Sequence, residues 1–99
     1  MFSHVVIFWT NPAQPQAAEE LVAGAQKYLA SIPGITHFQV GKMVPSHRPV
    51  VDQTYQVGLY VQFADKKAHD EYQVHPAHRE FVEKVLKPRR HKEIVYDFE

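Results

Sequence analysis

The chain has 99 residues, the size of one domain, and its 11 Lys and Arg residues balance its 11 Asp and Glu residues. A neutral chain has no overall charge to attract nucleic acid or an acidic membrane surface. The absence of cysteine excludes disulfides and thiol catalysis and is typical of a reducing cytoplasm. No apolar run approaches the roughly 18 residues of a membrane span, and no signal peptide is apparent. We therefore expect one domain over residues 1–99, a cytoplasmic location, and neither nucleic acid nor a membrane as a partner.

The first clear pattern is Ser3–Thr10, whose β-branched and aromatic residues predict a strand. Alternation places three side chains on one face of this strand: His4, Val6 and Phe8. The opposite face carries Val5, Ile7 and Trp9. Because both faces are largely apolar, we expect both to be covered in the folded protein.

A helix is predicted from the turn at Asn11–Pro15 to about Ser31, because apolar residues recur there at helical spacing. These residues are Ala18, Leu21, Val22, Ala25, Leu29 and Ile32. The proline and glycine of Ile32–Gly34 end the helix. A strand is expected over Ile35–Met43, and the polar segment Val44–Thr54, which contains two prolines, is expected to be a loop.

Tyr55–Phe63 shows the strictest alternation of the chain and predicts a strand with one apolar face toward the helices. That face carries Tyr55, Val57, Leu59, Val61 and Phe63. A second helical region follows, with Asp65 as its N-cap, a break at Pro76 and an end at Pro88. Glu93–Phe98 alternates again and predicts the last strand.

The order β-α-β-β-α-β is that of the ferredoxin-like α+β fold, a four-stranded antiparallel sheet with both helices on one face. The other face would then present a patch of large apolar side chains, too large to leave in water. Its residues are Val5, Ile7, Trp9, Tyr60, Ile94, Tyr96 and Phe98. We expect a homodimer in which two copies pair sheet against sheet.

A phenol and two imidazoles lie close together in the run Tyr72-Gln-Val-His75-Pro76-Ala-His78. The imidazole of His78 titrates near neutral pH, and the phenol of Tyr72 can donate to a carbonyl or enolate oxygen. The pair suits proton abstraction beside a carbonyl. The structural alternative is that Tyr72 and His78 bond to each other or to the backbone and only hold the helix break.

The other histidines favour structural roles. His75 precedes a proline at a helix start, where capping or packing is the simplest function, and His4 on a buried strand face is of interest only if it lies near Tyr72 and His78. His75 and His78, with His4 as a third ligand, could hold a metal, but no carboxylate accompanies them at convincing spacing. We expect no metal. Because no phosphate loop, nucleophile elbow or dinucleotide motif is present, we expect no cofactor either.

These features together resemble the stress-responsive dimeric α/β-barrel family, known as Dabb. The matching elements span nearly the whole chain: His4, Ile32-Pro33-Gly34, Gly41-Lys42, Tyr55, the Tyr72–His78 run and Asp97. The Tyr-x-x-His-Pro-x-His run is the most specific of them. The resemblance implies two ferredoxin-like subunits whose sheets pair into a barrel.

The resemblance also implies site roles. Plant polyketide cyclases of the olivetolic acid cyclase type, which are members of the family, use a tyrosine and a histidine of this run as an acid–base pair, and these map onto Tyr72 and His78, with His4 nearby. The implied pocket lies between sheet and helices, with walls formed by Val6, Phe8, Val22, Leu29, Phe38, Leu59 and Phe81. Charged Glu93 and Arg90 depart from the cyclase pattern.

Two functions follow as hypotheses. The first is a stress-associated protein that binds a small, largely apolar molecule without turnover. The second is a cofactor-independent acid–base enzyme, either a cyclase, an isomerase or a lyase, that uses Tyr72 and His78. A monooxygenase is a third and less favoured alternative, because Trp9 is the only redox-active side chain that the sequence offers near the fold's sheet.

Overall fold

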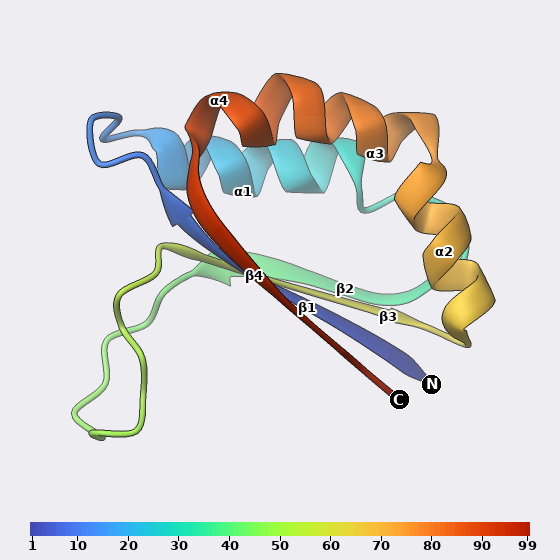
Figure 1. The fold of residues 1–99 in the computed structure, drawn as a ribbon, viewed down its shortest axis with the longest axis horizontal. Helices are drawn as coiled ribbons and strands as arrows, with labels where there is room; N and C mark the ends of the chain where they lie inside the picture. Colours follow the sequence, from blue (N-terminus) through green and yellow to red (C-terminus); the bar gives the residue numbers. More distant parts are fainter.

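The computed structural model describes residues 1–99 as one four-stranded antiparallel sheet with helices on one side (Figure 1). The strands are β1 (Phe2–Thr10), β2 (Ile35–Lys42), β3 (Val57–Phe63) and β4 (Arg90–Phe98), in the spatial order β2-β3-β1-β4. This is the predicted ferredoxin-like arrangement, with β1 central and paired to both β3 and β4.

The helical layer has five parts. The long helix α1 (Ala17–Tyr28) lies beside a second, broken helical region made of α2 (Lys66–Val74), α3 (Pro76–Phe81), a π-helical turn η1 (Val82–Leu86) and the short α4 (Lys87–Arg89). All of them cover the same face of the sheet, and the opposite face is open (Figure 1). None of the helices has both the length and the apolar composition that crossing a membrane would require.

Helix α1 packs very closely against the π-helical turn. Gly24 is buried in α1, and a Cβ at this position would overlap with the side chain of Val85. The helix ends at Tyr28, with Leu29 as its C-cap, and the chain turns back to the sheet through Gly34, whose φ of 96° lies in the region that favours glycine. The predicted end signal, Ile32–Gly34, is therefore confirmed, although the helix itself stops slightly earlier than Ser31.

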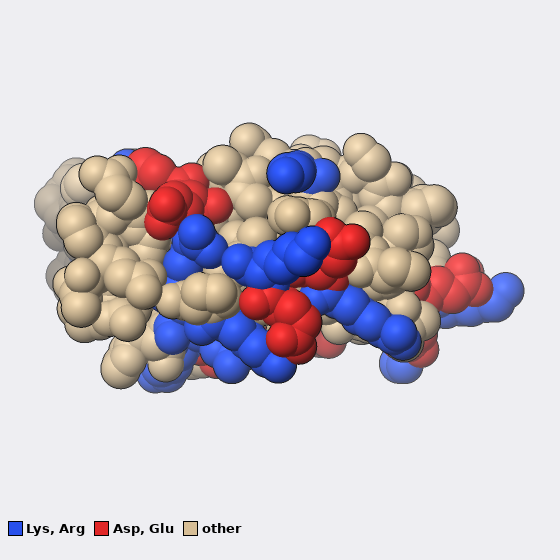
Figure 2. All heavy atoms as spheres, turned by 90° about the horizontal axis from the view of Figure 1, so that it is seen from above, with Lys and Arg blue, Asp and Glu red and all other residues tan.

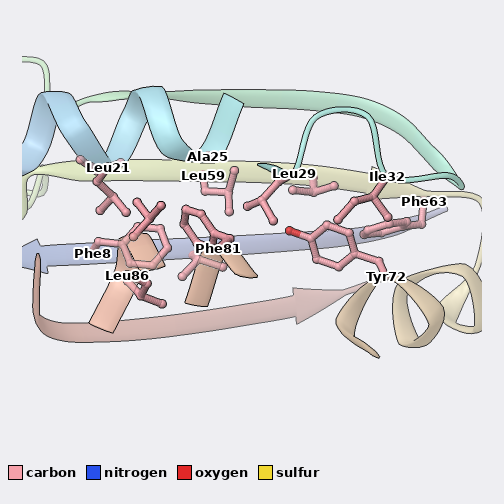
Figure 3. Packing of buried hydrophobic residues seen from close by; sticks show 14 of the residues in the cluster. Phe8, Leu21, Ala25, Leu29, Ile32, Leu59, Phe63, Tyr72, Phe81 and Leu86 are labelled. Carbon is pink, nitrogen blue, oxygen red and sulfur yellow. The ribbon is translucent and has the colours of Figure 1, made fainter. Parts of the chain in front are cut away.

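The core lies between the helices and the inner face of the sheet (Figure 3). On β3 the predicted alternation is confirmed, because Val57, Leu59, Val61 and Phe63 are all buried and the residues between them are not. The inner face of β1 contributes four further buried side chains: Phe2, His4, Val6 and Phe8. Because successive side chains of β1 alternate between the two faces of the sheet, His4 lies beneath the helices together with Phe2, Val6 and Phe8.

Three boundaries differ from the sequence prediction. Strand β3 begins at Val57, and the ring of Tyr55 meets Trp9 with centroids 6.4 Å apart, so Tyr55 does not share the helix-facing side. The helical region ends at Arg89, immediately after the predicted end at Pro88, which lies within α4 because a proline is tolerated in the first turn of a helix. Strand β4 begins at Arg90, because its pairing with β1 extends to Thr10.

The outer surfaces of the two layers differ in character. Figure 2 shows acidic and basic side chains intermixed over the helices, where ion pairs such as Lys84–Glu80 and Lys87–Glu83 join successive turns. The open face of the sheet is apolar, and in the single chain Tyr96 and Phe98 are 57% and 61% exposed. The mixed charges are typical of a solvated surface, whereas the apolar face is not.

Candidate functional site

The helix break is held by His75. This residue has extended backbone angles, with φ −65° and ψ 140°, and its Nδ1 accepts a hydrogen bond of 3.0 Å from the backbone N–H of Ala77. Pro76 starts α3, where the missing N–H is not needed. The capping role predicted for His75 is confirmed. Because α3 starts in a new direction after the break, Tyr72 at the end of α2 and His78 in α3 approach each other edge to face, with ring centroids 4.9 Å apart.

A cavity of about 210 Å³ lies between the inner face of the sheet and the helices. Most of the residues predicted from the sequence line it: His4, Val6, Phe8, Leu29, Leu59, Tyr72, His78 and Phe81. Two predicted wall residues do not. Val22 and Phe38 are partly buried and pack against the core, but the cavity lies over β1, β3 and β4, and Phe38 belongs to the edge strand β2 on the far side.

The remaining lining residues were not predicted. They are Gln73, Val82, Leu86, Arg90, Glu93 and Val95. The register of β4 explains two of them, because Val95 pairs with Val6 and Glu93 with Phe8, which places both on the inner face. Arg90 and Glu93 form an ion pair at the partly exposed edge of the cavity. The alternation of residues along β4 is the sequence signal for Glu93 and Val95, but it shows which residues point inward only once the partner strand is known.

Tyr72 is the most deeply buried polar group of the site. It is 1% exposed, and its hydroxyl is a buried polar atom without any hydrogen-bond partner. The oxygen points into the space between Leu29 and Phe81 rather than toward solvent (Figure 3). Burial raises the pKa of the phenol well above its usual value, so Tyr72 stays protonated at neutral pH and presents a donor without an acceptor.

His78 is held neutral. Burial, and the proximity of the His4 and His69 imidazoles, lower its pKa to about 4. The side chain is therefore an uncharged imidazole at neutral pH, and a weaker base than the usual histidine assumed from the sequence. Since the Tyr72 hydroxyl is unpartnered, the structural alternative in which the two side chains bond to each other is not what the structure shows.

His4 is paired with a carboxylate across the sheet. Asp97 lies opposite His4 in the register of β1 and β4, and its Oδ1 is 2.6 Å from Nδ1 of the imidazole. Burial lowers the pKa of His4, and the hydrogen bond to Asp97 opposes this effect. The structure thus brings together the three predicted candidates His4, Tyr72 and His78, and adds Asp97 as a fourth polar group.

His69 is a further member that sequence reasoning missed. It is 7% exposed, and its ring centroid lies 4.8 Å from that of His4. Gln73, one turn later on α2, places its amide nitrogen 3.2 Å from Nε2 of His69 and 3.5 Å from Nε2 of His4. The signal was available, because His69, Tyr72 and Gln73 follow the spacing of one helix face.

The metal ligands considered from the sequence are not assembled. His75 is used as a cap, and it does not line the cavity with His4 and His78. A different group is close together: one side-chain donor atom each from His4, His69 and Asp97, all within 4.8 Å of one another. These donors belong to a cluster different from the set considered from the sequence, which included His75 and His78.

The fold and this site define the class of protein. The sequence pattern of the stress responsive A/B barrel domain family, Dabb, matches residues 2–99, and the chain belongs to that family. A Dabb protein of Mesorhizobium loti with a ferredoxin-like fold is 28% identical, with a TM-score of 0.79 over 99% of this chain and 94% of that one. No curated protein matches the sequence.

More distant structures share the fold alone. A dimeric ferredoxin-like protein of unknown function from Thermobifida fusca is 19% identical, with a TM-score of 0.80 over 98% of this chain and 88% of that one. The hydroxynitrile lyase of Passiflora edulis is 14% identical, with a TM-score of 0.75 over 98% of this chain and 90% of that one. The fold therefore occurs both in an enzyme and in proteins without an established activity.

Proposed function

We propose that the protein binds a small, largely apolar molecule in the cavity and recognises an oxygen atom of that molecule through Tyr72. The unpartnered Tyr72 hydroxyl carries this proposal. A buried polar group without a hydrogen bond costs roughly 1–3 kcal/mol, and such groups are rare in native proteins. A ligand carbonyl or hydroxyl oxygen that accepts from the phenol would remove that cost.

The lining of the cavity supports the chemical class of the ligand. Nine of its 14 residues are hydrophobic, so the body of the ligand would be apolar. The volume of about 210 Å³ is below the roughly 300–1,000 Å³ of pockets for drug-sized molecules, so the ligand would be small. Arg90 at the cavity edge is engaged by Glu93, so an uncharged ligand oxygen would meet the other polar groups of the lining, which are Tyr72, His78, His4 and Gln73.

A cofactor-independent acid–base enzyme is the second candidate, and the pairing of His4 with Asp97 favours it. A carboxylate behind an imidazole orients the ring and stabilises the imidazolium that forms when the ring takes a proton. With its pKa near 4, His78 is the weaker acceptor of the two. In this reaction His4 would take a proton from the carbon beside a carbonyl, and Tyr72 would donate a hydrogen bond to the developing enolate oxygen.

We also propose that two copies pair through the open face of the sheet. Its apolar residues are Val5, Ile7, Trp9, Tyr60, Ile94, Tyr96 and Phe98, and Ile7, Trp9, Ile94 and Tyr96 line a shared hollow on that face. Leaving such a patch in water is unfavourable, and a second copy would cover it. Light scattering tests this. A dimer is expected at micromolar concentration, Ile7→Lys should shift it to monomer, and a stable wild-type monomer would contradict the proposal.

A thermal-shift screen tests the ligand proposal. Phenolic and β-keto compounds are screened against the wild type and Tyr72→Phe, with Tyr60→Phe as the matched control, because the Tyr60 hydroxyl lies outside the cavity and has partners in Ser3 and Gln62. A ligand raises the melting temperature by mass action, so a compound should stabilise the wild type and Tyr60→Phe more than Tyr72→Phe. Compounds that stabilise all three proteins equally would contradict a role for the Tyr72 hydroxyl.

Hydrogen exchange separates the two candidate functions. A bound β-keto compound is followed in deuterated water by NMR, with the wild type and with His4→Gln. Protein-catalysed exchange of the proton beside the carbonyl, lost in His4→Gln, would establish acid–base chemistry. Binding without exchange above the rate in buffer would establish the binding function alone.

A further inference from the structure

We propose that His4, His69 and Gln73 form a binding site for a divalent first-row transition-metal ion such as Zn²⁺. The site lies between α2 and β1, and it does not depend on the identity, or even the existence, of an organic ligand in the cavity.

Both imidazoles are held by carboxylates through the same nitrogen. Nδ1 of His4 is 2.6 Å from Oδ1 of Asp97, and Nδ1 of His69 is 3.2 Å from Oδ1 of Asp70. An ionised carboxylate can only accept a hydrogen bond, so each ring must carry a proton on Nδ1. When the rings are neutral, both Nε2 atoms are therefore unprotonated, which is the form that binds metals, and their lone pairs face the Gln73 amide.

The two Nε2 atoms converge on the side-chain amide of Gln73. The amide nitrogen lies 3.2 Å from Nε2 of His69 and 3.5 Å from Nε2 of His4. Rotating the amide by half a turn would put its oxygen, a metal ligand, where the nitrogen now lies. Ligand atoms about 2.1 Å from a tetrahedral metal are roughly 3.4 Å apart. The separations from Gln73 to both histidines already match this spacing.

The surroundings hold the histidines in place. His69 stacks on Phe2 with ring centroids 4.4 Å apart and meets the edge of Phe63 at 5.6 Å. Asp97 and Asp70 then play the part that carboxylates have behind the histidine ligands of many metal sites, where they fix the ring and raise its basicity. The rings of Phe2 and Phe63 exclude water on one side of the site, and the two carboxylates orient the imidazoles.

The donor set determines the class of metal. Imidazoles favour zinc, copper, nickel and cobalt ions, whereas magnesium and calcium require oxygen ligands. His4 and Gln73 also line the cavity, so a fourth coordination position would be reached from it. A set of three protein ligands with one open position is typical of zinc sites that take a water or another small ligand.

The experiment measures metal binding directly. Chelator-treated protein is titrated with Zn²⁺ by calorimetry and with Co²⁺ by visible absorption, whose intensity reports tetrahedral coordination. We expect one ion per chain and an affinity about 100-fold weaker in His69→Asn. Asp97→Asn, which removes the carboxylate behind His4, should weaken binding by about 10-fold. His91→Asn is the control, because His91 is an exposed histidine on β4.

A gain-of-affinity variant guards against loss of folding. Gln73→Glu replaces a neutral amide oxygen with a charged one and should tighten Zn²⁺ binding by at least about 10-fold, while leaving the fold intact because Gln73 is partly exposed. The proposal is overturned if the wild type binds no Zn²⁺, if His69→Asn binds as tightly as His91→Asn, or if Gln73→Glu leaves the affinity unchanged.

Discussion

The two ends of the core are equally buried but chemically opposite. Beneath the start of α1, the buried side chains of Phe8, Leu21 and Leu86 are hydrocarbon alone, and Phe8 and Leu86 also form part of the cavity wall (Figure 3). At the other end, against α2, lie His4, His69 and Tyr72. All six side chains are at most 7% exposed. The difference therefore lies in what each end requires: an apolar side chain needs only neighbours, whereas a polar one needs a partner of the right geometry.

The partners at the polar end are incomplete. Asp97 and Asp70 satisfy one nitrogen of each imidazole, but the Tyr72 hydroxyl has no partner and the two Nε2 atoms share one amide. At the apolar end, α1 and η1 pack so closely that a methyl group at Gly24 would overlap with Val85. We therefore expect stability to come mainly from the apolar end, whereas the proposed ligand recognition lies at the polar end.

The largest expected effect is at the apolar end. Leu21→Ala removes a fully buried side chain and should lower the free energy of unfolding by about 2–5 kcal/mol, because the lost burial and the resulting cavity both destabilise. Urea denaturation measures the change. The exposed Ala23→Gly, on the same helix, is the control and should cost about 1 kcal/mol. A loss from Leu21→Ala no larger than that of the control would show that the apolar end is loosely packed.

Gly24→Ala tests the close packing of α1 against η1. The added methyl group would displace Val85 and should cost about 1–3 kcal/mol, although alanine favours helix more than glycine does. The double variant Gly24→Ala/Val85→Ala should recover part of the stability, because it removes the overlapping side chain. An increase in stability in the single variant would contradict the close approach.

The pH dependence of stability tests the polar end. The pKa of His78 is about 4 in the folded protein and 6.5 for the unperturbed side chain. Between these values the unfolded chain binds a proton that the folded chain does not, so the free energy of unfolding should fall as the pH is lowered from 6.5 toward 4. The lowered pKa of His4 acts in the same direction.

The expected contribution of His78 is about 2 kcal/mol, allowing for its partial exposure. Urea denaturation is measured across this range in the presence of a chelator, with His78→Gln for comparison. Position 78 is faced by the imidazoles of His4 and His69 and by the phenol of Tyr72, which are present in both the wild type and the variant. The difference between the two pH curves therefore reports the titration of His78. Identical curves would contradict its buried, neutral state.

The smallest expected effect is that of Tyr72→Phe. Removing an unpartnered hydroxyl should leave the stability unchanged or raise it by about 1 kcal/mol. Tyr60→Phe makes the same change at a hydroxyl that accepts from Gln62 at 3.0 Å, and should cost about 0.5–1.5 kcal/mol. If Tyr72→Phe were the more destabilising of the two, the Tyr72 hydroxyl would have a hydrogen-bond partner in solution. The polar end of the core would then not contain an unsatisfied hydroxyl.

Local patterns were sufficient for most of the fold. The alternation of β3 predicted which of its side chains are buried, and the turn at Ile32–Gly34 and the break at Pro76 were placed correctly. They succeed because burial on a strand and the stereochemistry of proline and glycine act within a few residues. The prediction for Tyr55 was wrong because the alternation of apolar residues extends to Tyr55 in the sequence, whereas strand β3 begins only at Val57.

The site was predicted only in part. His4, Tyr72 and His78 were expected to lie together, from a resemblance to the family, and they line one cavity. Val22 and Phe38 were expected there and lie outside it, because wall positions depend on strand order and helix placement. His69 was not predicted as a member of the site, because its neighbours Phe2 and His4 are more than sixty positions away in the chain.

The sequence by itself determined which segments form strands, where the helix breaks, and the inward faces of β1 and β3, because these follow from the period of apolar residues and from backbone chemistry. Tertiary structure alone decided which polar groups meet. The pairing of β1 with β4 sets Asp97 against His4, and the packing of α2 on β1 sets His69 and Gln73 beside them. Such contacts join residues far apart in the chain, and their geometry depends on the register of strands and the position of a helix on the sheet.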